Sequence, residues 1–108
     1  MPLLALGLNH QTAPLTLRER VALDAGQLPA ALDGLGAVPG VAEAALLSTC
    51  NRTEIYCQVE DGAETGVADW LASYHDLAPA TLSDYLYVHR DDDAVRHLFR
   101  VATGLDSL

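Results

Sequence analysis

The amino-acid sequence predicts an α+β domain of the ferredoxin-like type, a split βαβ fold whose four-stranded antiparallel sheet has its helices packed on one face. Two observations lead to this fold class. Short segments with strand character alternate with segments of helical apolar spacing, and they follow one another in the order β-α(α)-β-β-α-β-α. That order is the one that a split βαβ unit requires. A small three-layer α/β unit with another strand order is the alternative.

The strands are expected at residues 3–8, 41–49, 54–60 and 85–89. The first is a continuous apolar run, typical of a strand covered on both faces, and Gly7 within it indicates a close approach of another backbone. The third strand alternates between apolar and polar residues. Ile55, Cys57 and Val59 are therefore expected to face the core, and Glu54 is expected on the opposite, solvent-exposed side.

Helices are expected where apolar residues recur at helical spacing. Thr16 and Glu19 have the spacing of a capping box, so a short helix is expected to begin at Leu17. A second helix must have Pro29 in its first turn, since proline inside a helix removes a hydrogen bond. A third helix has an apolar face made of Val67, Trp70, Leu71 and Tyr74.

The last helix is expected to begin after Asp91, which can act as its N-cap. Its predicted apolar stripe consists of Val95, Leu98, Phe99 and Ala102. At about 100° per residue, His97 lies about 200° from Val95, roughly opposite that stripe. His97 is therefore expected to face away from the core, where it is either solvated or part of a functional site.

The charge balance argues against a domain that grips nucleic acid through a broad basic face. Six arginines and no lysine stand against fifteen acidic residues, for a net charge of −9. No apolar run approaches the ~18–20 residues of a membrane span, and the first residues lack the basic lead of a signal peptide. Two cysteines in 108 residues do not make a disulfide scaffold. These features predict a cytoplasmic domain with no membrane segment.

The candidate chemistry lies in residues 48–52, a polar segment between two expected strands. Cys50 places a thiol there, and a cysteine thiolate is a strong nucleophile. The guanidinium of Arg52 can stabilise a thiolate or hold a carboxylate in a bidentate fork, and Thr49 and Asn51 add short hydrogen-bonding side chains. Two interpretations stay open. Cys50 is either a nucleophile or a small residue in a tight hairpin, beside an Arg52 that forms a surface ion pair.

Other sites are not expected within this chain. Cys57 shares a strand face with apolar residues, which predicts a buried, inert thiol. Neither the cysteine spacing nor the scattered histidines match a zinc-binding pattern, so no metal site is expected. The glycines do not follow a strand into a helix, as a dinucleotide-binding loop requires, so no cofactor-binding residues are expected either.

Three segments resemble the motifs of the glutamyl-tRNA reductase family. Residues 6–14 (LGLNHQTAP), with residues 17–19 (LRE), resemble its amino-terminal signature. Residues 48–56 (STCNRTEIY) resemble its catalytic motif, and residues 97–108 (HLFRVATGLDSL) resemble a third block. The motifs occur in the family's order and span nearly the whole chain. The catalytic domain of that family is ferredoxin-like, in agreement with the fold predicted from the element order.

The resemblance implies an activity and its residues. The family enzyme uses NADPH to reduce glutamyl-tRNA to glutamate-1-semialdehyde, the first step of tetrapyrrole (porphyrin) biosynthesis from glutamate. Carried over by position, Cys50 is the nucleophile that forms a thioester, and His97 is a catalytic histidine. The implied substrate-binding residues are Thr49, Cys50, Asn51, Arg52 and Ser107.

The resemblance also implies how the chain relates to a longer protein. Residues 1–108 correspond to most of the N-terminal catalytic domain, while the NADPH-binding domain and the dimerisation domain are absent from this chain. The fragment alone is thus expected to be inactive as a reductase. The implied partners are glutamyl-tRNA as substrate, a second copy joined through the absent C-terminal domain, and an enzyme that accepts the semialdehyde. The alternative function is a non-enzymatic ferredoxin-like sensor or interaction module, in which Cys50 is a redox-sensitive thiol.

Overall fold

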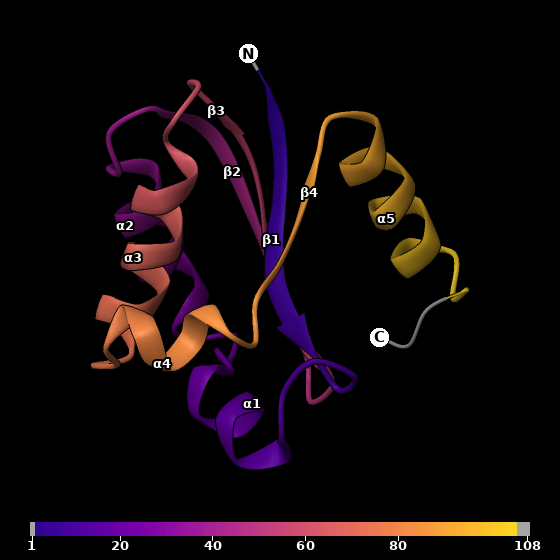
Figure 1. Cartoon of the computed structure of the whole chain (residues 1–108). Coiled ribbons are helices and arrows are strands. Elements are labelled where there is room, and N and C mark those ends of the chain that lie inside the picture. Colours follow the sequence, from indigo (N-terminus) through magenta and orange to yellow (C-terminus); the bar gives the residue numbers. More distant parts are fainter. Residues whose placement is uncertain (1, 106–108) are drawn as a thin grey trace.

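The computed structural model describes residues 2–105 and places helices on both sides of one sheet (Figure 1). In chain order the elements are β1 (Leu3–Asn9), α1 (Leu15–Val21), α2 (Leu28–Gly36), β2 (Val41–Ser48), β3 (Arg52–Val59), α3 (Glu64–Tyr74), α4 (Pro79–Ser83), β4 (Tyr87–Arg90) and α5 (Asp92–Ala102). The short helix α4 was not expected from the sequence, and the fourth strand, predicted at residues 85–89, spans Tyr87–Arg90.

The strands form an antiparallel sheet in the order β2-β3-β1-β4. The predicted α+β class, the four-stranded antiparallel sheet and the split βαβ strand order are therefore confirmed. β1 is central and pairs with both β3 and β4. Gly7 of β1 stands opposite Glu54 of β3 and Tyr87 of β4. Directly opposed residues share a sheet face, so a residue without a side chain lies between two large polar ones.

The apolar core lies between one face of the sheet and helices α2, α3 and α4 (Figure 1). The side chains of Ile55, Cys57 and Val59 are 0–2% exposed, as the alternation of the third strand predicts. Core residues from the other elements are Leu4, Leu6, Leu8, Val21, Leu35, Val67, Leu71 and Leu82. All residues of β1 from Leu4 to Asn9 are buried, which confirms that this strand is covered on both faces.

Helix α5 corrects the expectation that the helices pack on one face. It contacts β1 and β4 from the side of the sheet opposite to α2–α4 (Figure 1). Its inward residues are Ala94, His97 and Val101. The predicted inward stripe faces outward instead, with Phe99 63% exposed. The physical reason is the Glu54 carboxylate on this sheet face, whose burial requires a polar partner, and His97 supplies one.

The starts of two helices also differ in detail from the sequence prediction. Helix α1 begins at Leu15 after Pro14, and no side chain caps it, so the predicted Thr16 capping box does not form. Pro14 has an extended backbone (ψ 158°) and no N–H, which lets the helix begin directly after it. Asp91 occupies the N-cap of α5 as expected, but its carboxylate accepts a hydrogen bond from the Leu3 N–H (3.1 Å). Asp91 thus ties α5 to β1.

Among the helices of residues 2–105, none is both long and apolar enough to cross a membrane.

The close approach at Gly7 generates the first testable prediction. A Cβ atom at position 7 would lie 2.4 Å from the Thr53 carbonyl oxygen and 3.0 Å from Glu54 Cα and Cγ. Backbone atoms cannot give way cheaply, so Gly7→Ala is expected to lower the opening free energy of the β1 and β3 amides by about 1–3 kcal/mol. Hydrogen exchange of the full-length protein, read on peptides from these strands, measures this change.

The matched control is Gly36→Ala at the end of α2, where an added Cβ would meet nothing within 4 Å. This variant is expected to leave exchange in β1 and β3 unchanged. Equal protection of β1 and β3 in Gly7→Ala and in the unmodified protein would contradict the close-approach argument.

Candidate active site

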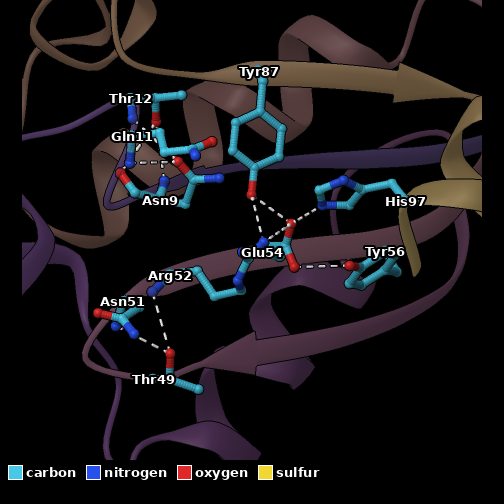
Figure 2. A network of polar contacts seen from close by, with 10 residues as sticks. All are labelled: Asn9, Gln11, Thr12, Thr49, Asn51, Arg52, Glu54, Tyr56, Tyr87 and His97. Carbon is cyan, nitrogen blue, oxygen red and sulfur yellow. Dashed lines mark hydrogen bonds and ion pairs between the residues drawn. The ribbon is translucent and has the colours of Figure 1, made fainter. Parts of the chain in front are cut away.

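Cys50 lies on the tight turn between β2 and β3, with its side chain exposed. The Thr49 N–H donates to the Arg52 carbonyl oxygen (2.7 Å), which closes the turn. The Thr49 hydroxyl oxygen accepts the N–H groups of Asn51 (3.1 Å) and Arg52 (3.2 Å), as Figure 2 shows. The side chain of Thr49 therefore shapes the turn that presents the thiol.

Arg52 begins β3 and forms a buried ion pair with Glu54. The Arg52 side chain and the Glu54 side chain are both 0% exposed, and Nη1 of Arg52 lies 3.2 Å from Oε2 of Glu54. The two residues are two positions apart on one strand, so they lie on the same face of the sheet. This geometry excludes the interpretation of Arg52 as a member of a surface ion pair.

The Glu54 carboxylate is the centre of a polar network to which three elements contribute. Oε2 accepts a hydrogen bond from the Tyr87 hydroxyl of β4 (2.5 Å) and is also bound by Nε2 of His97 from α5. Oε1 accepts the Tyr56 hydroxyl of β3 (2.8 Å). Figure 2 shows these side chains converging on Glu54. Each oxygen of the buried carboxylate thus has partners, as a buried charge requires.

The burial of Glu54 overturns the prediction of a solvent-exposed face for the third strand. Gln58 and Glu60 of that face are exposed as expected, but Glu54 is 0% exposed. The sequence does hold a signal for the difference, because Arg52 and Glu54 are opposite charges at the i, i+2 spacing that places them side by side on a strand. Sequence reasoning missed Glu54, Tyr56 and Tyr87 as parts of the site.

Burial and hydrogen bonding act in opposite directions on the Glu54 carboxyl. Burial, the largest influence, by itself would raise its pKa. Hydrogen bonds from Tyr87, His97 and Tyr56, with the charge of His97, outweigh burial and hold the pKa of Glu54 below its usual value. Burial, and then the bond to Glu54, raise the pKa of the Tyr87 hydroxyl. At neutral pH Glu54 is therefore an anion, and Tyr87 is a neutral donor.

A second histidine stacks on His97. The ring centroid of His89 lies 4.5 Å from that of His97, with 26° between the ring planes, and the Tyr87 ring lies 5.3 Å from His97. Burial lowers the pKa of His89, and the neighbouring His97 lowers it further, against the opposing effects of Asp93 and Glu54. His89 is thus a neutral ring that packs against His97.

The structure brings together several of the residues that the sequence singled out. Arg52 and His97, 45 positions apart in the chain, share the Glu54 carboxylate. Thr49, Cys50 and Asn51 form the turn that leads into Arg52. The predicted site residue Ser107 lies outside the described residues 2–105.

The second cysteine lies apart from this site, in the apolar core. Cys57 is 2% exposed, and burial raises the pKa of its thiol to about 11, which confirms the prediction of a buried cysteine. Within residues 2–105, no group of three or more histidine, cysteine, aspartate or glutamate side chains is placed to hold a metal ion.

The buried pair predicts a large cost for removing its negative partner. Glu54→Gln keeps the size of the side chain but leaves the buried Arg52 charge without its carboxylate, so the free energy of unfolding is expected to fall by about 3–5 kcal/mol at neutral pH. The urea concentration at which the buried Cys57 thiol reacts with a dipyridyl disulfide measures this in the full-length protein. The control Glu64→Gln breaks an exposed pair with Arg90 and should change little.

The same variant has an expected pH signature. Because the pKa of Glu54 is lower in the folded than in the unfolded protein, its stabilising contribution is complete above the unfolded pKa of about 4.3. The contribution is lost as the pH falls through the folded pKa. Below about pH 4 the unmodified protein should lose stability more steeply than Glu54→Gln. Parallel pH profiles would contradict an ionised Glu54 in the folded protein.

Comparison with known proteins shows the family to which this chain belongs. A family model described as glutamyl-tRNA reductase, N-terminal domain, matches residues 6–108. Glutamyl-tRNA reductase of Marinobacter nauticus is 53% identical over the 108 residues, which are 25% of its length, and that of Xanthomonas campestris pv. campestris is 61% identical, with 24% of its length covered. The chain thus spans about a quarter of the length of these curated relatives.

A solved structure is also similar. Glutamyl-tRNA reductase from Methanopyrus kandleri superposes with a TM-score of 0.62 at 30% sequence identity, over 98% of this chain and 23% of that one. Fold, motifs and family model therefore agree, and the chain belongs to the glutamyl-tRNA reductase N-terminal domain family.

Proposed function

We propose that the protein containing this chain reduces glutamyl-tRNA to glutamate-1-semialdehyde, the first step of tetrapyrrole biosynthesis, and that residues 1–108 are most of its catalytic, substrate-binding domain. The observation that carries the proposal is the position of Cys50. Its exposed thiol sits on a tight turn two residues before Arg52, whose buried guanidinium is fixed by Glu54. Membership of the reductase family supports this reaction for that thiol.

The chemistry of the turn is acyl transfer. The Cys50 thiolate attacks the ester carbonyl that links glutamate to the tRNA ribose. A carbon–sulfur bond forms, the ester carbon–oxygen bond breaks, and the ribose oxygen leaves with a proton. The product is a glutamyl thioester on Cys50. A covalent route suits this reaction because a thioester carbonyl is reduced more readily than an ester.

The substrate-binding residues are proposed to be Thr49, Cys50, Asn51, Arg52 and Ser107. Arg52 is suited to a substrate carboxylate, since its planar guanidinium can donate two parallel hydrogen bonds. Its pair with Glu54 holds the guanidinium in place before substrate arrives. The hydrogen bonds of Thr49 to the turn fix Asn51 and Arg52 relative to Cys50 in the same way.

Residues 2–105 do not form a dinucleotide-binding site of the kind that would hold NADPH, the proposed hydride donor. The sheet of residues 2–105 is antiparallel, and β1 leads into a turn held by Asn9 and not into a glycine-rich loop and helix. NADPH supplies the hydride for reduction of the thioester when it is bound. We place its site in a domain outside this chain, and we expect the chain alone to be inactive as a reductase.

The same proposal extends to partners and location. Glutamyl-tRNA is the substrate, the full-length protein is a homodimer through a C-terminal domain outside this chain, and an enzyme that accepts the aldehyde is a partner, because aldehydes are reactive products. We propose a cytoplasmic location, which is consistent with a charged tRNA as substrate. The net charge of −9 indicates that the tRNA is held at a local site or by another part of the protein.

The thioester mechanism predicts the effect of removing the thiol. Cys50→Ser in the full-length protein should lower aldehyde formation by roughly 10³-fold or more, because nucleophile and acyl carrier are lost together. Mass spectrometry of the unmodified protein, incubated with glutamyl-tRNA and without NADPH, should find glutamate on the peptide containing Cys50. Cys57→Ala is the control, since Cys57 is buried in the core. Substantial activity in Cys50→Ser would refute the role of Cys50 as nucleophile, whereas no acylation of Cys50 and no aldehyde from the unmodified protein would favour the alternative of a non-enzymatic, redox-sensitive thiol.

His97 is proposed to be the second catalytic residue, and its step can be separated by experiment. We expect His97→Asn to lower turnover, since an imidazole can move a proton near neutral pH and asparagine cannot. Acylation of Cys50 and formation of aldehyde are measured separately. Loss of both assigns His97 to acyl transfer, and loss of aldehyde alone assigns it to reduction. His75→Asn, which changes a histidine at the end of α3, is the control, and normal rates in His97→Asn would refute a catalytic role.

A further inference from the structure

Arg18 of α1 connects two segments that are distant in sequence. Its Nε donates to the carbonyl oxygen of Ala13 (3.2 Å), and its Nη1 donates to the carbonyl oxygen of Cys50 (3.1 Å). The residue that carries the exposed thiol is thus bonded to a helix 32 positions earlier in the chain. A planar guanidinium can hold two acceptors in fixed relative positions, which a single ammonium cannot do.

The Ala13 end of this connection is firmly placed. Ala13 is 6% exposed, and its N–H donates to the Asn9 carbonyl oxygen (2.9 Å). The Asn9 side-chain oxygen accepts the N–H groups of Gln11 (2.9 Å) and Thr12 (3.1 Å). Asn9 ends β1 and pairs with Arg52 in the sheet. Arg18 therefore extends from a loop anchored on the sheet to the exposed turn.

The charge of Arg18 is not used in an ion pair within the part of the chain that the structure describes. No carboxylate of residues 2–105 lies within ion-pair distance of its guanidinium, whereas Arg52 is paired with Glu54. A cation bonded only to carbonyl oxygens keeps its full charge beside the turn. That charge favours an anion formed at the turn during the reaction, such as the oxyanion of a tetrahedral intermediate.

We propose that Arg18 is a positioning residue for the reaction of Cys50: it fixes the turn through the Cys50 carbonyl and places a positive charge at the turn that carries the thiol. This inference rests on the proposed function, in which Cys50 is the nucleophile. The reason that position matters is that attack on a carbonyl requires near-attack geometry, and a displacement of about 1 Å can cost about 10²-fold in rate. The half-buried side chain of Arg18 is not part of the apolar core, so the fold is expected to depend on it less than the geometry of the turn does.

The test uses Arg18→Met and Arg18→Lys in the full-length protein, with Arg20→Met as matched control. Arg20 is an exposed arginine on the same helix, and its replacement removes the same charge and length of side chain. Two quantities are measured: kcat and KM for aldehyde formation from glutamyl-tRNA, and the rate at which iodoacetamide alkylates the peptide containing Cys50. Hydrogen exchange of β1 and β3 reports whether the fold is retained.

Arg18→Met is expected to lower kcat by roughly 10-fold to 10²-fold with little change in KM, and to slow alkylation of Cys50. Arg18→Lys should recover part of the loss, since lysine restores the charge and one hydrogen bond but cannot hold both carbonyls. Arg20→Met should match the unmodified protein in both measurements.

Three results would overturn the proposal. Normal kcat and normal alkylation in Arg18→Met would show that the turn needs no support from α1. A raised KM with unchanged kcat would assign Arg18 to substrate binding. Equal losses in Arg18→Met and Arg20→Met would indicate a general charge effect. In each case an inactive Cys50→Ser would leave the role of Cys50 standing, so the two proposals fail separately. If Arg18→Met does not fold, kcat and the alkylation rate of Cys50 are compared between Arg18→Lys and its matched control Arg20→Lys. A loss in Arg18→Lys alone supports the proposal, and equal values overturn it.

Discussion

The buried carboxylate of Glu54 is the constraint on which the second face of the sheet depends. A charge removed from water is tolerated only when hydrogen bonds and an opposite charge replace its hydration. Arg52, Tyr87 and His97 supply that replacement from three different elements. The register that sets Gly7 between Glu54 and Tyr87 supplies the space for it. Glycine placement and the docking of α5 are therefore both matched to one polar requirement.

Helix α5 illustrates how this requirement can outrank apolar burial. Its Phe99 and Val95 are 63% and 39% exposed, while its histidine is 9% exposed. Rotating the helix to bury those apolar residues would carry His97 away from Glu54 and leave a buried carboxylate with fewer partners. Losing one apolar contact costs less than leaving a buried charge uncompensated. As a result, α5 leaves some apolar surface exposed next to Leu46 and Leu47 of β2.

The candidate site combines a rigid scaffold with an exposed thiol, the proposed nucleophile. The Arg52–Glu54 pair and the stacked rings of His89 and His97 are held by the sheet and by α5. Cys50 lies outside that scaffold on a turn, with its side chain exposed. Reactive residues are often found on loops positioned by regular elements, and here Arg52 is the link, since it closes the turn and begins the strand. A thiol on a turn gains access to substrate but needs support to hold one geometry.

What the sequence determined is local. The apolar run of β1, the alternation of Ile55, Cys57 and Val59 and the polar break around Cys50 predicted the sheet, one of its faces and the turn. These features are readable because strand periodicity depends only on neighbouring residues. The motifs around Cys50 and His97 also led to the correct family.

Only the tertiary structure decided how the second face is used. Alternation sorts the residues of β3 into two faces, but it cannot tell whether a helix from the end of the chain covers the second one. Helical spacing likewise predicted that the more apolar face of α5 points inward. The prediction uses only the residues of the helix itself, so it takes no account of Glu54, 43 positions earlier. The hydrogen bond from Arg18 to the Cys50 carbonyl oxygen also joins residues that are distant in sequence, so no local pattern predicts it. Such contacts depend on which charges and carbonyls the folded chain leaves without water, and that is a property of the packed molecule, not of any local pattern.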